Sequence, residues 1–295
     1  MESQRKISAL LVHKTLLELH LGFKNMYETY FDLKQKPFSI TASPSFLFLS
    51  QRHKEALSYL TYGIKERVGF IEITGEVGTG KTTLCRALLN RMDEKTKTAF
   101  IFNSNLTELQ LMQTIIEDLG IKTAKRDKGA LFSELNRFLI EQLTLGNNVV
   151  LIIDEAQNLS MRLLEQVRML SNLEAENQKL LQIVLVGQPE LREKLKSSSL
   201  RQLRQRIYVR YHIQALTREE VPQYIAHRLK LAGANGSAPF FDPSALEGIC
   251  DYTGGIPRLI NVLCDKALLM AYVLEKRTID AGIIQQCVTE IEGGI

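Results

Sequence analysis

The most informative segment of the chain is Gly69-Phe70-Ile71-Glu72-Ile73-Thr74-Gly75-Glu76-Val77-Gly78-Thr79-Gly80-Lys81-Thr82-Thr83. A short β-branched run opens it, a glycine-rich turn follows, and the periodic apolar segment 84–89 comes next. Strand, loop and helix in this order form the context that a phosphate-binding loop requires. The spacing G-x-x-x-x-G-K-[ST] is met without a gap by Gly75, Gly80, Lys81 and Thr82. The sequence therefore predicts a nucleotide-binding site at this loop.

The residue types of the loop suit a chain of phosphates. Glycines let the backbone curl so that successive N–H groups point at phosphate oxygens, and the helix that opens at Lys81 adds its positive dipole end. We expect Lys81 to reach the outer phosphates and the Thr82 hydroxyl to bind Mg²⁺. The predicted nucleotide contacts in the loop are Gly75, Glu76, Val77, Gly78, Thr79, Gly80, Lys81, Thr82 and Thr83.

A second functional signal is the run Asn148-Val149-Val150-Leu151-Ile152-Ile153-Asp154-Glu155, in which a continuous apolar strand ends in two acids. Such a strand is typical of the centre of a parallel sheet covered on both faces, with functional groups at its carboxyl edge. We predict that Asp154 holds Mg²⁺, directly or through water, and that Glu155 orients and deprotonates the attacking water. A solvated strand end is the alternative, and the apolar run together with the upstream loop argues against it.

Strands and helices alternate up to residue 213, which predicts an α/β fold with a doubly wound parallel sheet and right-handed crossovers. Beyond Leu216 the pattern is helical, starting with a helix that Thr217 caps. We predict an N-terminal arm at 1–25, a nucleotide-binding core at 26–213 and a small helical lid at 214–295. Further predicted helices span 51–65 (capped by Ser50), 107–119, 130–143 and 161–173, and further strands span 98–103, 181–186 and 206–213.

The aromatic stretch from Met26 to Phe48 is punctuated by Lys36-Pro37-Phe38 and Ser43-Pro44. We expect it to lie over the core, where it either walls an adenine ring or packs without touching a ligand. The sequence alone leaves both alternatives open.

Polar residues near the remaining strands are candidates for sensing the nucleotide. Gln188 ends the strand 181–186 and is predicted to contact the γ-phosphate or the attacking water, with a simple turn residue before Pro189 as the alternative. Arg204 and Arg206 precede the last strand, and either could enter a neighbouring subunit's site as an arginine finger, with Arg204 favoured. A solvated basic face and contacts with DNA phosphates are the rival readings. Arg258 opens a lid helix after Gly254-Gly255-Ile256-Pro257 and is predicted to reach the phosphates.

The composition is ordinary for a soluble globular protein with one large and one small domain. The chain has 295 residues, of which 45% are hydrophobic and 24% charged. A net charge of +4 permits an anionic partner without requiring one. The four cysteines are scattered without a C-x-x-C pair, so neither a zinc site nor a disulfide framework is indicated and a reducing cytoplasm is expected. No apolar run is long enough to span a bilayer, and residues 1–25 lack the cleavage site of a signal peptide.

This set of motifs resembles the AAA+ ATPases, and within them the ExeA/GspA-type family of bacterial secretion-associated ATPases. The matching segments include 70–83, 152–159, 170–174, 185–191, 203–206 and 255–261, with Met26-Tyr27-Glu28-Thr29-Tyr30-Phe31 near the start. The resemblance implies a P-loop NTPase core with a C-terminal helical lid. It assigns Lys81 and Thr82 to Walker A, Asp154 and Glu155 to Walker B, Gln188 to sensor 1, Arg204 or Arg206 to the finger, and Arg258 to sensor 2.

The function that this resemblance implies is hydrolysis of ATP to ADP and phosphate, with ATP and Mg²⁺ as the bound groups. It also implies a nucleotide-dependent homo-oligomer, a ring or a filament, and a protein partner in secretion, pilus or exopolysaccharide assembly. The expected location is the cytoplasm, including the inner membrane surface through partners. A DNA-associated regulator of the transposition type is the alternative function, and a slowly cycling, nucleotide-gated scaffold is a third.

Overall fold

The computed structural model describes residues 26–40, 46–102, 106–175, 178–234 and 240–293. The chain forms two compact units. One is an α/β unit within Ala42–Ala215, and the other is a helical unit built, in its described part, from residues 26–40 and from Leu216 onward.

Five parallel strands form the sheet of the α/β unit, in the order β2-β3-β6-β1-β7. Their bounds are β1 Phe70–Gly75, β2 Thr96–Ile101, β3 Asn148–Ile153, β6 Gln182–Gly187 and β7 Ile207–Ile213. The strand β1 lies between β6 and β7, and it pairs Thr74 with Gly187 and with His212. The prediction of an α/β fold with a parallel sheet is confirmed.

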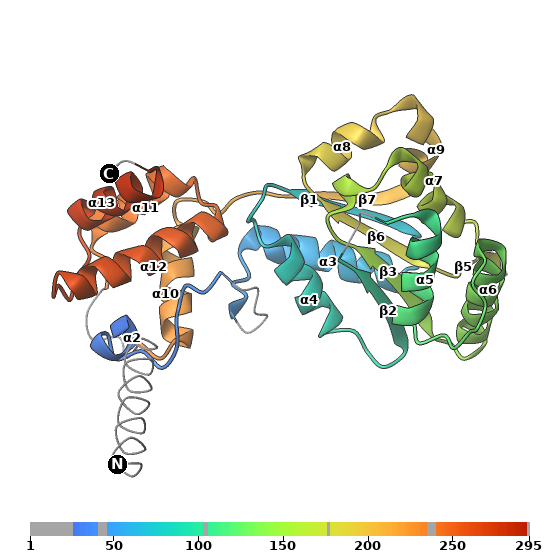
Figure 1. The fold of residues 1–295 in the computed structure, drawn as a ribbon, viewed down its shortest axis with the longest axis horizontal. Helices are drawn as coiled ribbons and strands as arrows, with labels where there is room; N and C mark the ends of the chain where they lie inside the picture. The colour runs from blue at the N-terminus through green and yellow to red at the C-terminus, as the bar shows by residue number, and fades with distance from the viewer. Residues whose placement is uncertain (1–25, 41–45, 103–105, 176–177, 235–239, 294–295) are drawn as a thin grey trace, which may run out of the picture. The chain divides into compact units, whose positions relative to one another are not determined.

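Helices cover both faces of this sheet (Figure 1). The helices α3 (Gln51–Lys65) and α4 (Lys81–Leu89) pack on one face, where Val150 and Ile152 of β3 point. The other face takes Val149, Leu151 and Ile153 and is covered by five helices. These are α5 Glu108–Asp118, α6 Lys128–Thr144, α7 Met161–Leu170, α8 Pro189–Leu195 and α9 Arg201–Arg206. Every residue of β3 after Asn148 is buried because alternate side chains enter two cores.

Four short elements complete the described part of the α/β unit. The 3-10 turns η3 and η4 span Ala156–Asn158 and Ser198–Leu200. The strands β4 (Glu174–Ala175) and β5 (Gln178–Lys179) pair antiparallel apart from the main sheet.

Several predicted boundaries are confirmed and others are shifted. The helix predicted at 51–65 has these bounds, and the Ser50 side chain accepts a hydrogen bond from the backbone N of His53. Thr107 forms a capping box with Gln110 at the start of α5. The last strand begins at Ile207 because Arg206 still belongs to α9. The helix predicted from Thr217 begins at Glu220, although the Thr217 hydroxyl accepts a hydrogen bond from the Glu220 N at 3.3 Å.

The helical unit contains α2 (Met26–Tyr30), α10 (Glu220–Leu231), α11 (Pro243–Thr253), α12 (Pro257–Val273) and α13 (Ala281–Ile291). The last helices pack around a seam of apolar residues that includes Leu263, Ala267 and Ile284. In the part of the chain that the structure describes, no helix has both the length and the apolar character to cross a membrane.

The segment 26–40 belongs to the helical unit, which corrects the predicted core of 26–213. Its aromatic rings explain the difference. Phe31 packs on Phe240 with ring centroids 5.4 Å apart, and Phe38 meets Phe241 edge-on at 6.2 Å. Arg228 of α10, itself buried, donates from Nε to the Pro37 carbonyl at 2.6 Å. Packing within the helical unit therefore accounts for the buried aromatics of this segment, and the predicted arm 1–25 lies outside the described residues.

Candidate nucleotide-binding site

The turn after β1 needs its glycines. Gly78 and Gly80 have φ of +83° and +91°, in the left-handed region that side chains with a Cβ rarely adopt. Gly80 is also the N-cap of α4, so the helix begins where the loop ends. A Cβ on Gly75 would lie 2.7 Å from the Ile213 carbonyl of β7, so this position admits only a glycine without a shift of backbone. The predicted phosphate loop thus has the backbone shape that the motif requires.

Lys81 lies inside this loop. Its side chain is buried, and Nζ donates to the carbonyls of Gly75 at 2.8 Å and Glu76 at 2.9 Å. Burial lowers the pKa of Lys81, while the carboxylates of Glu155, Asp154 and Glu76 act in the opposite direction. The ammonium is therefore held at the loop by backbone acceptors and sits in the field of the acids that end β3.

The end of β3 brings Asp154 to the first turn of α4. Thr82 Oγ1 donates to Asp154 Oδ2 at 2.6 Å, and the Glu155 N donates to Asp154 Oδ1 at 2.9 Å. Burial raises the pKa of Asp154, and the hydrogen bonds from Thr82 and Glu155 oppose that shift. A hydroxyl and a carboxylate oxygen side by side are ligands that Mg²⁺ prefers. Among the described residues no three acidic, histidine or cysteine side chains form a metal cluster, so these two oxygens would hold Mg²⁺ together with phosphate oxygens and water.

Glu155 is held in place by two amide side chains. Gln157 Nε2 donates to Glu155 Oε2 at 2.5 Å, and Gln188 Nε2 donates to the same oxygen at 3.1 Å. Gln157 Oε1 in turn accepts from the Gln188 N at 3.0 Å. The Glu155 backbone has a left-handed φ of +51°. Such backbone strain costs about 1–3 kcal/mol in a residue other than glycine and is concentrated at functional sites. The structure thus joins the acid at the end of β3 to Gln188 at the end of β6.

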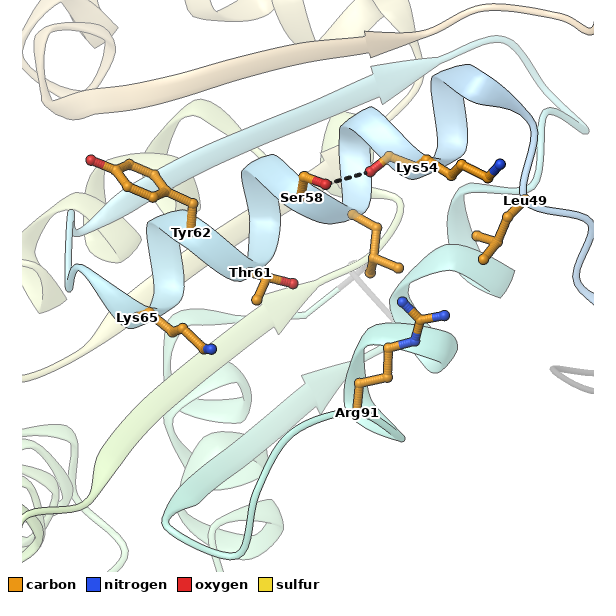
Figure 2. A pocket seen from close by; sticks show the side chains of 8 residues that line it. Leu49, Lys54, Ser58, Thr61, Tyr62, Lys65 and Arg91 are labelled. Carbon is orange, nitrogen blue, oxygen red and sulfur yellow. Dashed lines mark hydrogen bonds between the residues drawn. The ribbon is translucent and has the colours of Figure 1, made fainter.

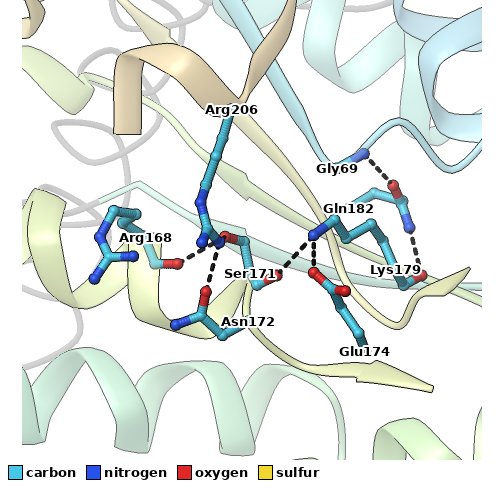
Figure 3. Close-up of polar contacts among 8 residues, drawn as sticks. All are labelled: Gly69, Arg168, Ser171, Asn172, Glu174, Lys179, Gln182 and Arg206. Atoms are coloured by element: carbon cyan, nitrogen blue, oxygen red, sulfur yellow. Dashed lines mark hydrogen bonds and ion pairs between the residues drawn. The ribbon is translucent and has the colours of Figure 1, made fainter. Parts of the chain in front are cut away.

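The two finger candidates have different surroundings. Figure 3 shows Arg206, which donates to Ser171 Oγ at 2.8 Å and to Asn172 Oδ1 at 2.5 Å, and both acceptors follow α7 in the same unit. Arg204 is half-buried like Arg206, and among the described residues its side chain makes one hydrogen bond, from Nη1 to the Lys196 carbonyl at 3.2 Å. Arg258 lies exposed in the first turn of α12 in the helical unit. Of the two candidates, Arg204 therefore has the side chain with fewer hydrogen bonds to its own unit.

Two contacts at this site involve residues that are not among the predicted site residues. Gln157 holds Glu155, and His53 of α3 places Nε2 at 2.9 Å from the Thr79 carbonyl of the loop. Gln157 stands two residues beyond Glu155, and His53 stands three beyond the helix cap Ser50. Neither spacing indicates a functional role by itself.

Two adjoining cavities lie away from this site. Figure 2 shows one of about 450 Å³ beside α3, with Lys65 and Arg91 among its lining residues. A second, of about 520 Å³, shares Thr61, Lys65 and Arg91 with it. Neither is lined by a predicted site residue.

Comparisons with known proteins agree with this geometry. Residues 64–195 match a family model described as an AAA domain. General secretion pathway protein A of Aeromonas hydrophila is 43% identical over 270 residues, which cover 91% of this chain and 49% of that protein. The chain thus spans about half the length of this relative.

Solved structures share the fold at low sequence identity. The Aeropyrum pernix ORC2 protein has a TM-score of 0.65 at 18% identity, over 87% of this chain and 71% of that one. Cdc6p of Pyrobaculum aerophilum has a TM-score of 0.64 at 17% identity, over 86% and 70%. The RuvB Holliday junction branch migration motor of Thermotoga maritima has a TM-score of 0.56 at 18% identity, over 83% and 72%. These likenesses support a P-loop AAA+ fold and nothing finer.

Proposed function

This chain is an AAA+ protein related to general secretion pathway protein A, and from that premise we propose that it binds Mg·ATP and hydrolyses it to ADP and phosphate. The observation that carries the proposal is the 2.6 Å hydrogen bond between Thr82 Oγ1 and Asp154 Oδ2. It joins the phosphate loop to the acidic end of β3, as a site for a metal-bound triphosphate requires.

Each side chain has a part in binding. Lys81 would exchange its hydrogen bonds to two loop carbonyls for hydrogen bonds to phosphate oxygens. Hydrogen bonds between a charged donor and a charged acceptor are stronger than those between neutral groups. Thr82 and Asp154 would hold Mg²⁺, which neutralises charge on the β- and γ-phosphates when bound. Loop N–H groups between Gly75 and Thr83 would bind the remaining oxygens.

Glu155 would serve as the base. A water molecule attacks the γ-phosphorus, the new O–P bond forms, and the bond from that phosphorus to the β–γ bridging oxygen breaks to release ADP. The proton of the water passes to the Glu155 carboxylate. Gln188 already donates to this carboxylate at 3.1 Å, so its amide would orient both the base and the attacking water.

Activity in this proposal depends on assembly. Arg204 would complete the site of a neighbouring copy in a ring or filament, where a guanidinium stabilises charge on the transferring phosphoryl group. Arg258 would report the state of the phosphates to the helical unit, which acts as a lid. Four described thiols without disulfides agree with action in the cytoplasm, or at the inner membrane through partners.

The work that hydrolysis drives would be assembly or remodelling of a secretion, pilus or exopolysaccharide-export system through a protein partner. The 43% identity to general secretion pathway protein A favours this assignment over DNA regulation, which only fold neighbours at 16–19% identity suggest. A slowly cycling scaffold would form nucleotide-dependent oligomers with negligible turnover.

One set of measurements separates these functions. We expect light scattering to show larger assemblies with ATP than with ADP or without nucleotide, and phosphate release to rise with assembly. Turnover that stays negligible while assemblies form would select the scaffold. ATPase activity that duplex DNA stimulates, with binding that weakens steeply with salt, would select the DNA regulator.

A further inference from the structure

A side chain from outside the phosphate loop holds one of its carbonyls. His53, in the first turn of α3, is 4% exposed, and its Nε2 lies 2.9 Å from the Thr79 oxygen. Its Nδ1 lies 2.7 Å from Ser50 Oγ, and that oxygen also accepts a hydrogen bond from the His53 backbone N at 3.3 Å. The buried ring therefore connects the cap of α3 to the loop at both of its nitrogens.

The two partners define the proton positions on the ring. A carbonyl oxygen can only accept, so Nε2 carries the hydrogen and donates it to Thr79. In the neutral ring Nδ1 is then an acceptor, and the Ser50 hydroxyl donates to it. The hydrogen bonds run in one direction, from Ser50 through His53 to Thr79.

Fixing the Thr79 carbonyl also fixes the direction of the next N–H. A trans peptide is planar, so the Gly80 N–H points opposite to the Thr79 carbonyl and hence away from α3. No acceptor among the described residues is bonded to this N–H. A Cβ on Gly80 would lie 3.2 Å from His53 Nε2, so the ring and the loop are in close contact. The arrangement leaves a directed donor free at the phosphate side of the loop.

We propose that His53 is a positioning residue of the nucleotide site, which orients the Gly80 N–H toward a phosphate oxygen by holding the Thr79 carbonyl. His53 itself does not touch the nucleotide. The inference rests on the proposed nucleotide binding and adds to it a residue outside the G-x-x-x-x-G-K-[ST] motif.

A matched pair of amides tests this role. In His53→Gln, the side-chain amide N–H reaches about as far as the histidine Nε2 and can still donate to the Thr79 carbonyl. In His53→Asn, the side-chain amide N–H reaches only as far as the histidine Nδ1. We expect His53→Asn to raise the Kd for fluorescent Mg·ADP by about tenfold and His53→Gln to raise it by less than about threefold. Leu60→Ala, which removes a fully buried side chain of α3, is the stability control and should change the Kd by less than about twofold.

A second readout reports on the Gly80 amide directly. Its ¹H–¹⁵N resonance should move when Mg·ADP is added to the wild type and to His53→Gln, and should move much less in His53→Asn. An unchanged Kd together with an unchanged Gly80 response in His53→Asn would overturn the proposal, and so would Leu60→Ala raising the Kd as much as His53→Asn does. A wild-type protein that does not bind Mg·ADP at all would refute the proposed function instead.

Discussion

Replacing Arg206 with alanine should weaken the fold, because the side chain ties the end of α9 to the end of α7. The substitution removes hydrogen bonds of 2.8 Å to Ser171 and 2.5 Å to Asn172. A hydrogen bond from a charged group contributes about 1.5–3 kcal/mol, and because the Asn172 contact is exposed we expect a total loss of about 2 kcal/mol. For a unit of this size 1 kcal/mol lowers the Tm by about 2–4 °C, so the Tm should fall by about 4–8 °C.

Arg204→Ala is the matched variant, since among the described residues the Arg204 side chain has one hydrogen bond, to the Lys196 carbonyl at 3.2 Å. We expect it to change stability by less than about 0.5 kcal/mol. Its ATPase rate in the assembled state should fall by about 10³-fold or more, because it removes the arginine offered to the neighbouring site. Nucleotide affinity should stay near that of the wild type.

Thermal melts and phosphate release from mixed assemblies separate the two arginines. Glu155→Gln subunits lack the base but still carry Arg204, so mixing them with Arg204→Ala subunits should restore activity at the mixed interfaces. The assignment of the finger to Arg204 is wrong if Arg206→Ala melts like the wild type, is inactive alone and regains activity when mixed with Glu155→Gln. That result would make Arg206 the finger.

Other substitutions test the remaining contacts. In Glu155→Gln the new side-chain oxygen can still accept hydrogen bonds from Gln157 and Gln188, so this variant should bind Mg·ATP normally. Its kcat, measured by stopped-flow phosphate release, should fall by about 10²–10⁴-fold. Normal turnover would exclude Glu155 as the base. Burial raises the pKa of Asp154 above its unfolded value, so its ionised form costs folding free energy at neutral pH, and that cost disappears as the pH falls through the folded pKa. Asp154→Asn should therefore raise the Tm without Mg²⁺, flatten its dependence on pH and abolish the rise that Mg·ADP causes; a Tm below the wild type would contradict this. Arg228→Ala removes hydrogen-bond donors to the carbonyls of Pro37 at 2.6 Å and Ser39 at 3.1 Å. It should lower the stability of the helical unit by about 3 kcal/mol and speed chymotrypsin cleavage after Phe38. Unchanged cleavage would show that aromatic packing alone holds the segment 26–40 in place.

The parts of the site that are each formed by one continuous stretch of sequence could be predicted. The loop from Gly75 to Thr83 and the acids after Ile153 are each a continuous stretch whose residue types specify their own local geometry. Parallel strands bring their carboxyl ends to one edge of a sheet, so the proximity of Thr82 to Asp154 followed from the fold class. The roles assigned to these residues stay predictions until kinetics test them.

Contacts between distant elements could not be predicted in the same way. Arg204 and Arg206 look alike in sequence, and only the turn after α7 distinguishes them, because Ser171 and Asn172 lie beside Arg206. His53 reads as an ordinary helix residue until α3 is packed beside the loop.

The segment 26–40 illustrates a further limit. Its aromatic residues show that it must be buried, but their partners Phe240 and Phe241 lie near the other end of the chain. Burial of an apolar segment is encoded locally, whereas the surface that buries it is a property of the tertiary fold.

Calorimetric titration of Mg·ATP into Glu155→Gln protein, with and without the additional change Lys81→Ala, measures nucleotide binding at this site without turnover. We predict saturable binding that depends on Mg²⁺ in the single variant, and a Kd raised by at least about 100-fold in the double variant, which loses the buried ammonium at the loop. Equal affinity of the two proteins for Mg·ATP would contradict the claim that the loop and the acidic end of β3 form one nucleotide site.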